Sequence, residues 1–128
     1  VRGPIVMTTQ KRSARQTYMD GLCEGRLLYQ FDEDTRTAVF YPREVGPGGR
    51  VASLAWRESA GLGTLYSHTH VKSRAGDFTI ALVDLDEGFR MMSTVVGVEP
   101  SMLSIGMRVK AGFETDGEEL RVIFGVAP

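Results

Sequence analysis

From Arg26 to the end of the chain, short apolar runs alternate with glycine-rich or acidic turns, and this pattern limits the fold more than any other feature. The runs lie at residues 26–31, 37–42, 51–58, 64–73, 77–85, 89–98, 108–115 and 119–127. Asp116 and Gly117 between the last two runs are typical of a tight hairpin turn. The chain is therefore expected to be mainly β.

The second half of the chain predicts five strands, with a short helical break at Pro100 between the fourth and the fifth. Short strands punctuated by glycine favour a small Greek-key barrel, with the OB-fold as the leading candidate. Within the run 64–73, strict alternation would place side chains on two faces. Thr64, Tyr66, His68 and His70 would share one face, and Leu65, Ser67, Thr69 and Val71 the other.

One segment, residues 8–27, has helical character. Thr8 or Thr9 is a candidate N-cap, and the helix is expected to close at Gly25. Its apolar residues at helical spacing are Tyr18, Met19, Leu22 and Cys23. Gly21 weakens the helix by about 1 kcal/mol relative to alanine, so the helix needs a surface on which to dock.

The 128 residues, with a net charge of −1 and a pI of about 6.1, fit one domain or one small domain with an appendage. This charge provides no basic face for nucleic acid. A single cysteine, Cys23, excludes an intrachain disulfide and a cysteine-based zinc site. No apolar run approaches the roughly 20 residues of a membrane span, and the N-terminus lacks the apolar region of a signal peptide. A cytoplasmic protein is expected, and whether Met7 is the native start stays open.

Five segments occur in the order and spacing of one family: YMDGLCEGRLLYQ, FYPRE, LAWRESAGLGTLYSHT, ALVDLDEGFRMMS and SMLSIGMRVKAGFE. Over residues 17–127 the chain resembles the DUF35-type OB-fold proteins, small accessory subunits of thiolase-like acyl-CoA enzymes. The strongest motifs are Gly61-x-Gly63-x-x-Tyr66-Ser67, Asp84-x-x-Glu87-Gly88 and Gly106-x-x-Val109. The resemblance implies an N-terminal helix, a rubredoxin-like zinc ribbon and a C-terminal OB-fold barrel.

The four cysteine positions of the family's ribbon are occupied by Asp32, Thr35, Gly46 and Gly49 in this sequence. Threonine and two glycines cannot complete a tetrahedral zinc site, so no zinc is expected. We interpret residues 27–50 as a degenerate, metal-free ribbon arm, between a tail and helix at 1–26 and an OB-fold domain at 51–128. The alternative is that the Gly-Pro-Gly-Gly stretch is an ordinary loop rich in turns.

The sequence offers few groups for catalysis. His68 and His70 are spaced to share one face of a strand, and a metal there would need a third ligand such as Asp84 or Asp86. Cys23 has no histidine near it in sequence, which favours a packing role. Nothing assembles a general acid, a general base and an oxyanion site, so the chain is predicted to be no enzyme.

The resemblance implies a non-catalytic accessory subunit that binds and supports a thiolase-fold, acyl-CoA-processing enzyme in condensation, thiolysis or retro-aldol cleavage. The predicted contacts with this partner or with acyl-CoA are Phe40, Tyr41, Pro42, Arg43, Trp56, Tyr66 and His68. The fork of the Arg43 guanidinium suits a CoA phosphate or a partner carboxylate. Core packing is the alternative for Trp56.

A hetero-oligomer is expected and a homo-oligomer stays open, without a membrane partner. The alternative function is an OB-fold protein that binds single-stranded nucleic acid by stacking bases on Trp56, Tyr66 and Phe113. The strands 77–85 and 89–96 that would form such a face carry one basic residue, Arg90, so nucleic acid is not the predicted partner.

Overall fold

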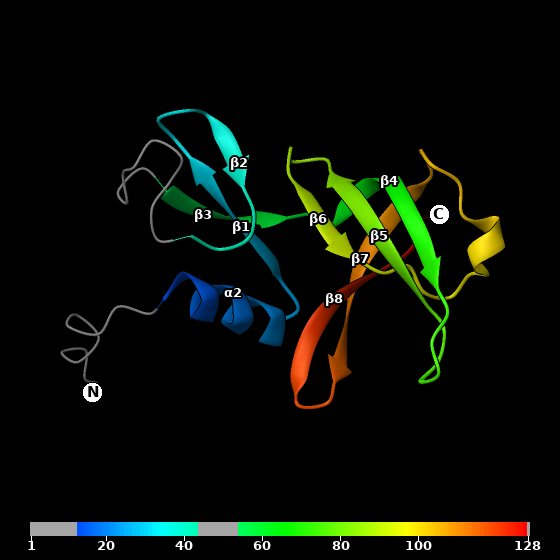
Figure 1. Cartoon of the computed structure of the whole chain (residues 1–128). Helices are drawn as coiled ribbons and strands as arrows, with labels where there is room; N and C mark the ends of the chain where they lie inside the picture. Colours follow the sequence, from blue (N-terminus) through cyan, green and yellow to red (C-terminus); the bar gives the residue numbers. More distant parts are fainter. Residues whose placement is uncertain (1–12, 44–53, 128) are drawn as a thin grey trace.

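The computed structural model describes residues 13–43 and 54–127, which form one α-helix and two antiparallel sheets (Figure 1). The first part comprises α2 (Ala14–Cys23), β1 (Leu27–Asp32), β2 (Thr37–Val39) and β3 (Leu54–Ser59). The second comprises β4 (Leu62–Val71), β5 (Phe78–Leu85), β6 (Arg90–Ser93), the 3-10 helix η2 (Pro100–Met102), β7 (Arg108–Asp116) and β8 (Glu119–Val126). The mainly β fold is confirmed.

The three-stranded sheet has the order β2-β1-β3. β3 corresponds to the run 51–58, which was expected in the barrel, but it pairs along its whole length with β1, from Leu54 opposite Asp32 to Ser59 opposite Leu27. Periodicity reports which residues are apolar and says nothing about which strand they pair with, so the sequence could not place β3.

The five-stranded sheet has the order β6-β5-β4-β7-β8 and curls into a barrel. A parallel bridge between Val95, two residues beyond the end of β6, and Phe124 of β8 connects the two edges of the sheet. It is supported by a bond from the Val96 N–H to the Phe124 carbonyl at 2.8 Å. The five-stranded OB-fold barrel is therefore confirmed. The predicted helical break forms as η2, but it lies between the third and fourth strands of this sheet, because β3 is not one of its strands.

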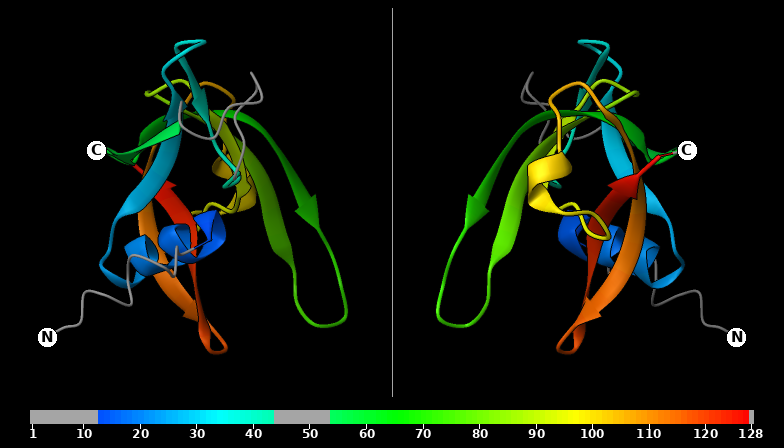
Figure 2. Two further views of the ribbon diagram at one scale, coloured as in Figure 1. Left: turned by 90° about the vertical axis from the view of Figure 1, so that its left-hand side faces the viewer. Right: turned by 90° about the vertical axis from the view of Figure 1, so that its right-hand side faces the viewer.

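A β-bulge at Tyr66 changes the predicted alternation along β4. Leu65 lies opposite Val83, whereas Ser67 lies opposite Leu82, so Tyr66 is the extra residue. Since directly opposed residues share a face, Leu65 lies on the same face as His68, not on the face of Ser67. The predicted alternation placed Leu65 on the face of Ser67 and Thr64 on the face of His68. Both assignments were wrong because of the bulge. Beyond the bulge, the β4–β5 hairpin projects from the barrel (Figure 2).

The helix α2 begins at Ala14, because the Ser13 side chain accepts a hydrogen bond from the Gln16 N–H as an N-cap. The predicted caps, Thr8 and Thr9, lie outside the described residues. At Gly21 the helix approaches β1 so closely that a Cβ atom would stand 2.7 Å from Leu28 Cδ1. The surface on which the helix docks is thus its own sheet. Cys23 is exposed and does not pack, contrary to expectation.

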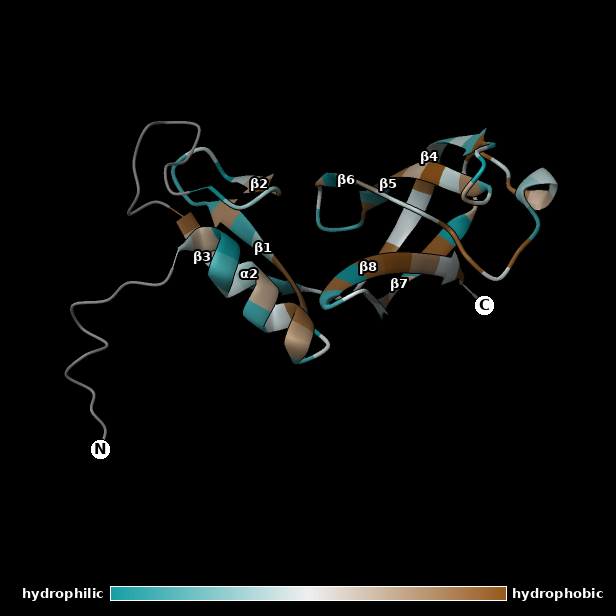
Figure 3. Cartoon of the chain, turned by 60° about the horizontal axis from the view of Figure 1, so that its bottom comes forward, coloured by the Kyte–Doolittle hydropathy of each residue, from teal (hydrophilic) through white to brown (hydrophobic). Residues whose placement is uncertain are grey.

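One continuous core joins the helix, the three-stranded sheet and the barrel. Its most deeply buried apolar members are Leu65, Ala81, Val83, Val109 and Phe124. Figure 3 shows apolar residues along β1 and β8, which contribute to this core from the two sheets. Among the described residues, no helix is long and apolar enough to cross a membrane.

Glu87, in the turn between β5 and β6, fixes the short link from β3 to β4. Its carboxylate accepts hydrogen bonds from the Ser59 hydroxyl at 2.7 Å and from the Ala60 N–H at 2.8 Å. At Gly63 a Cβ atom would lie 2.7 Å from the Asp84 carbonyl oxygen, so only glycine allows β4 to approach β5 this closely. These contacts give a structural reason for two of the motifs that carried the resemblance.

Candidate functional site

The segment that follows β2, Phe40–Arg43, lies across the junction between the three-stranded sheet and the barrel. We call it the arm. The Phe40 ring stacks on the ring of Phe89 with centroids 4.9 Å apart and meets Tyr18 of the helix edge-on at 5.6 Å. Tyr29 stacks on Phe89, also at 4.9 Å. Such aromatic pairs each contribute about 0.5–1.5 kcal/mol beyond burial. Phe40 therefore anchors the arm to its own barrel.

The two ends of the exposed part of the arm are also held. The Tyr41 hydroxyl accepts a hydrogen bond from the Met92 N–H at 3.1 Å, and Tyr41 has a left-handed backbone with φ of 31°. The buried Gln30 side chain binds the backbone of Arg43 twice, at 2.7 and 2.8 Å. The ring of Tyr41 nevertheless stays 59% exposed, and Arg43 is exposed too. The arm thus presents an aromatic and a cationic side chain on a fixed backbone.

The turn after β1 is held by Asp32, the first of the four degenerate ribbon positions. Its Oδ1 accepts hydrogen bonds from the N–H groups of Asp34 at 2.9 Å and Thr35 at 3.3 Å. Arg36 closes the turn with φ of 59°. A side-chain oxygen therefore organises the turn, as is usual for aspartate in this position. Gly46 and Gly49 lie outside the described residues.

A shallow pocket of about 400 Å³ lies beside the arm, between residues 37–43 and the turn into β6. We call it the arm pocket. Arg43 and Arg90 are its charged lining residues. Arg90 is bound to Asp84 at 3.2 Å, and its guanidinium lies 3.5 Å from the ring centroid of Tyr66. Through Arg90 the structure links the predicted contact Tyr66 to the arm.

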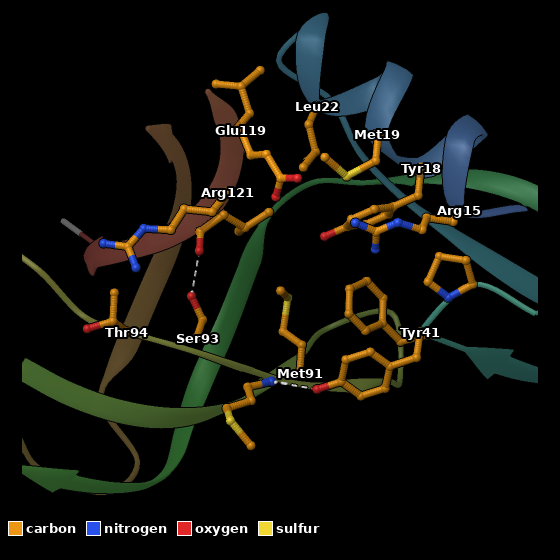
Figure 4. A pocket seen from close by; sticks show the side chains of 15 residues that line it. Arg15, Tyr18, Met19, Leu22, Tyr41, Met91, Ser93, Thr94, Glu119 and Arg121 are labelled. Atoms are coloured by element: carbon orange, nitrogen blue, oxygen red, sulfur yellow. Dashed lines mark hydrogen bonds between the residues drawn. The ribbon is translucent and has the colours of Figure 1, made fainter. Parts of the chain in front are cut away.

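A larger groove of about 460 Å³ lies on the other side of the arm (Figure 4). It is found between β6 and β8, which diverge from the bridge at Val95 and Phe124, and the helix α2 covers its opening. We call it the seam groove. Met19, Leu22, Met91 and Val122 are among its apolar lining residues. Its polar lining residues include Arg15, Tyr18, Ser93, Glu119 and Arg121. The helical periodicity marked Tyr18, Met19 and Leu22 as one face, but no sequence signal indicated that this face borders a groove.

Tyr18 has the most strongly altered protonation equilibrium at the groove. Burial first, and then the nearby Tyr41, raises the pKa of the Tyr18 hydroxyl to about 12. The phenol stays protonated at neutral pH, so its O–H group is available to donate a hydrogen bond to a ligand in the groove.

The other predicted site residues lie apart from the arm. Trp56 is half-buried on β3, opposite Gln30, and is no member of the buried core. His68 is half-buried on β4, opposite Ala81, and His70 lies opposite Thr79 on the same face. The structure thus groups Phe40, Tyr41, Pro42 and Arg43 in the arm. Tyr66 is connected to the arm pocket only through Arg90, and Trp56 and His68 lie on other strands.

The candidate third ligands for a histidine metal site have other partners. Asp84 binds Arg90, and Asp86 binds Arg108, whose hydrogen bonds lower the pKa of the Asp86 carboxyl. His70 instead lies 3.5 Å from Asp77 across the hairpin. In the part of the chain that the structure describes, no three histidine, cysteine, aspartate or glutamate side chains are grouped to hold a metal.

The three aromatic residues considered for base stacking do not form one surface. Trp56 belongs to the three-stranded sheet, whereas Tyr66 and Phe113 belong to β4 and β7 of the barrel. Phe113 is half-buried against the core, and Tyr66 is covered by Arg90.

Comparison with known proteins gives this arrangement a family. The family model of the ChsH2 C-terminal OB-fold domain matches residues 56–114. A solved chain of the "Ltp2-ChsH2(DUF35) aldolase" superposes with a TM-score of 0.78 at 26% identity, covering 99% of this chain and 100% of that one. In sequence and fold the chain is similar to DUF35-type OB-fold proteins. A DUF35-family protein of unknown function from Sulfolobus solfataricus shares the fold, with a TM-score of 0.65 at 14% identity over 89% of this chain and 85% of that one.

A curated relative of this chain is the 3-oxo-4,17-pregnadiene-20-carboxyl-CoA hydratase alpha subunit of Mycobacterium tuberculosis. The two are 40% identical over 60 residues, which is 43% of this chain. The match spans only 19% of the length of the relative. Two of these three similar proteins are thus named after a carboxyl-CoA hydratase and an aldolase.

Proposed function

We propose that this chain is a non-catalytic accessory subunit that binds and supports a thiolase-fold, acyl-CoA-processing enzyme. The reaction class is condensation, thiolysis or retro-aldol cleavage. Similarity over nearly the whole chain to a DUF35 chain of an aldolase supports a hetero-oligomer. The CoA ester in the name of the curated relative supports acyl-CoA as the substrate class.

The observation that carries the proposal is the construction of the arm. Phe40 and Gln30 fix the arm to the protein, while Tyr41 and Arg43 stay exposed at its surface. Tyrosine and arginine are enriched among the residues that dominate binding energy at interfaces. Because the backbone is already ordered, little conformational entropy is lost when a partner binds. The arm therefore suits docking of another protein.

The chemistry is assigned to the partner. Cys23 is exposed on α2, and His68 lies on the projecting hairpin, on a different element. The described residues bring no nucleophile together with a general base. This chain would line part of the acyl-CoA channel of the partner, with Arg43 placed to bind a CoA phosphate or a partner carboxylate. It would hold no cofactor of its own.

Co-purification from the native host, followed by activity assays, tests the proposal. The expected result is that a thiolase-fold enzyme co-purifies with this chain, that the isolated chain turns over no acyl-CoA, and that adding it raises the activity of the isolated partner. Turnover of an acyl-CoA by the isolated chain would contradict the accessory role.

A further inference from the structure

The seam groove contains hydrogen-bond donors that the fold itself does not use. The Tyr18 hydroxyl lines the groove and makes no hydrogen bond with any described residue, although its ring is half-buried. Arg15 precedes it by three residues on α2, so both side chains lie on the same face of the helix. Figure 4 shows both side chains extending into the groove. Within residues 13–43 and 54–127, Arg15 forms no ion pair.

Of the other charged and hydroxyl groups that line the groove, Arg121 and Ser93 have partners within the fold, Glu119 is acidic, and the Thr94 hydroxyl is a neutral group near β6. Arg121 donates two hydrogen bonds to Glu114, at 2.5 and 2.9 Å, and the Ser93 hydroxyl donates to the Val122 carbonyl at 2.7 Å. Glu119, at the start of β8, lines the groove beside Leu22 at the end of the helix. The charged donor available to a ligand is therefore Arg15 on the helix, and Glu119 contributes a negative charge to the same groove.

Apolar side chains form the rest of the lining. Met19 and Leu22 project from the helix, and Met91 and Val122 lie on the two diverging strands. Methionine adapts its shape to varied apolar surfaces. A volume of about 460 Å³, with an apolar lining and a few directed polar groups, is within the range of small-molecule sites.

We propose that the seam groove binds a small amphipathic carboxylate, whose apolar body packs against Met19, Leu22 and Met91 and whose carboxylate accepts hydrogen bonds from Tyr18 and Arg15. This inference goes beyond the proposed function, because it gives this chain a ligand of its own. The groove shares Phe40, Tyr41 and Pro42 with the arm, but the donors assigned to the ligand lie on α2. A carboxylate fits better than an alcohol or an amine, since the helix side offers an arginine and a phenol as donors. An amine would face Arg15.

Isothermal titration calorimetry on the full chain, with decanoate, decanol and decylamine as probes below their self-association concentrations, tests the proposal. Decanoate is expected to bind in a 1:1 ratio and more tightly than the other two. Tyr18→Phe and Arg15→Gln should each weaken decanoate binding about tenfold or more, as expected for a lost hydrogen bond to a charged group. The matched controls Tyr66→Phe and Arg74→Gln, both away from the groove, should leave it unchanged.

Glu119 supplies a test of the charge of the ligand. Glu119→Gln removes a negative charge from the groove, so decanoate should bind more tightly to this variant and decylamine should not. Equal binding of decanoate and decanol, with no effect of Tyr18→Phe or Arg15→Gln, would overturn the proposal, because an apolar surface alone would then explain the binding. Absence of decanoate binding would overturn it too. Chemical-shift changes confined to α2, residues 40–42, β6, residues 94–95 and β8 in the NMR spectrum would support the location.

Discussion

The Phe40 ring lies almost parallel to the ring of Phe89, with an interplanar angle of 11° and centroids 4.9 Å apart. One residue comes from the arm and the other from the turn into β6, 49 positions later in the sequence. This contact, with the edge-on contact between Phe40 and Tyr18, fixes the arm against the barrel and the helix. It divides the roles in the arm: Phe40 holds it in place, and Tyr41 and Arg43 are left for a partner.

Phe40→Ala should therefore destabilise the isolated protein. Truncation of a fully buried phenylalanine costs about 3–5 kcal/mol, and the half-buried Phe40 should cost about 2–3 kcal/mol. Urea unfolding followed by circular dichroism measures this free energy. Phe78→Ala, in an exposed position on the hairpin, is the matched control and should change stability by less than about 0.5 kcal/mol. Equal effects of the two substitutions would show that Phe40 is not an internal anchor.

Glu87 should stabilise the fold through its two hydrogen bonds to the β3–β4 link. Glu87→Ala leaves the buried Ser59 hydroxyl and the Ala60 N–H without this acceptor, so a loss of about 1–3 kcal/mol is expected. Glu87→Gln keeps one oxygen acceptor and should lose less. Glu118→Ala, in the exposed β7–β8 turn, is the control for removal of a glutamate. Thermal unfolding of the three variants should rank them in that order of damage.

The raised pKa of Tyr18 predicts a loss of stability in alkali. The hydroxyl ionises near pH 10 in the unfolded chain and at about 12 in the folded protein. Its contribution to the unfolding free energy is therefore complete below pH 10 and is lost as pH rises from 10 to 12. The unfolding free energy of wild type minus that of Tyr18→Phe should fall over this range. A difference that stays constant with pH would contradict burial of the hydroxyl.

The degenerate ribbon predicts that the protein needs no zinc. Purified protein should contain no stoichiometric zinc by elemental analysis, and a chelator should leave its Tm unchanged. Asp32→Ala should lower the Tm, because the turn loses the acceptor for the Asp34 and Thr35 N–H groups. One tightly bound zinc ion per chain would refute the interpretation of residues 27–50 as a degenerate, metal-free ribbon.

The sequence indicated the strands and the family better than the pairing of the strands. Turn chemistry at Asp116 and Gly117 located the β7–β8 hairpin, since a local signal determines a two-residue connection. Asp116 itself pairs with Glu119, so the two connecting residues are Gly117 and Glu118. β3 was placed in the barrel because nothing in its own residues shows that it pairs with β1. The bulge at Tyr66 was missed, because one unpaired residue leaves the apolar pattern of the strand nearly unchanged.

The candidate site was predicted in part. The segment 40–43 was identified from the family resemblance, and the structure shows that Phe40 faces inward while Tyr41 faces solvent. That difference depends on Phe89, which lies far away in sequence. The seam groove was not predicted, because its residues come from the helix, the arm, β6 and β8, and only the folded barrel brings these segments together.

The affinity of this chain for its thiolase-fold partner, measured for wild type and for the double variant Tyr41→Ala/Arg43→Ala, tests the central claim most directly. The variant should stay folded, because the barrel core does not include either side chain, and should bind the partner at least tenfold more weakly. Phe78→Ala/Arg74→Ala, which removes an aromatic side chain and an arginine from the hairpin, should bind like wild type. Unchanged affinity of a folded Tyr41→Ala/Arg43→Ala variant would contradict the claim that the arm is the docking element.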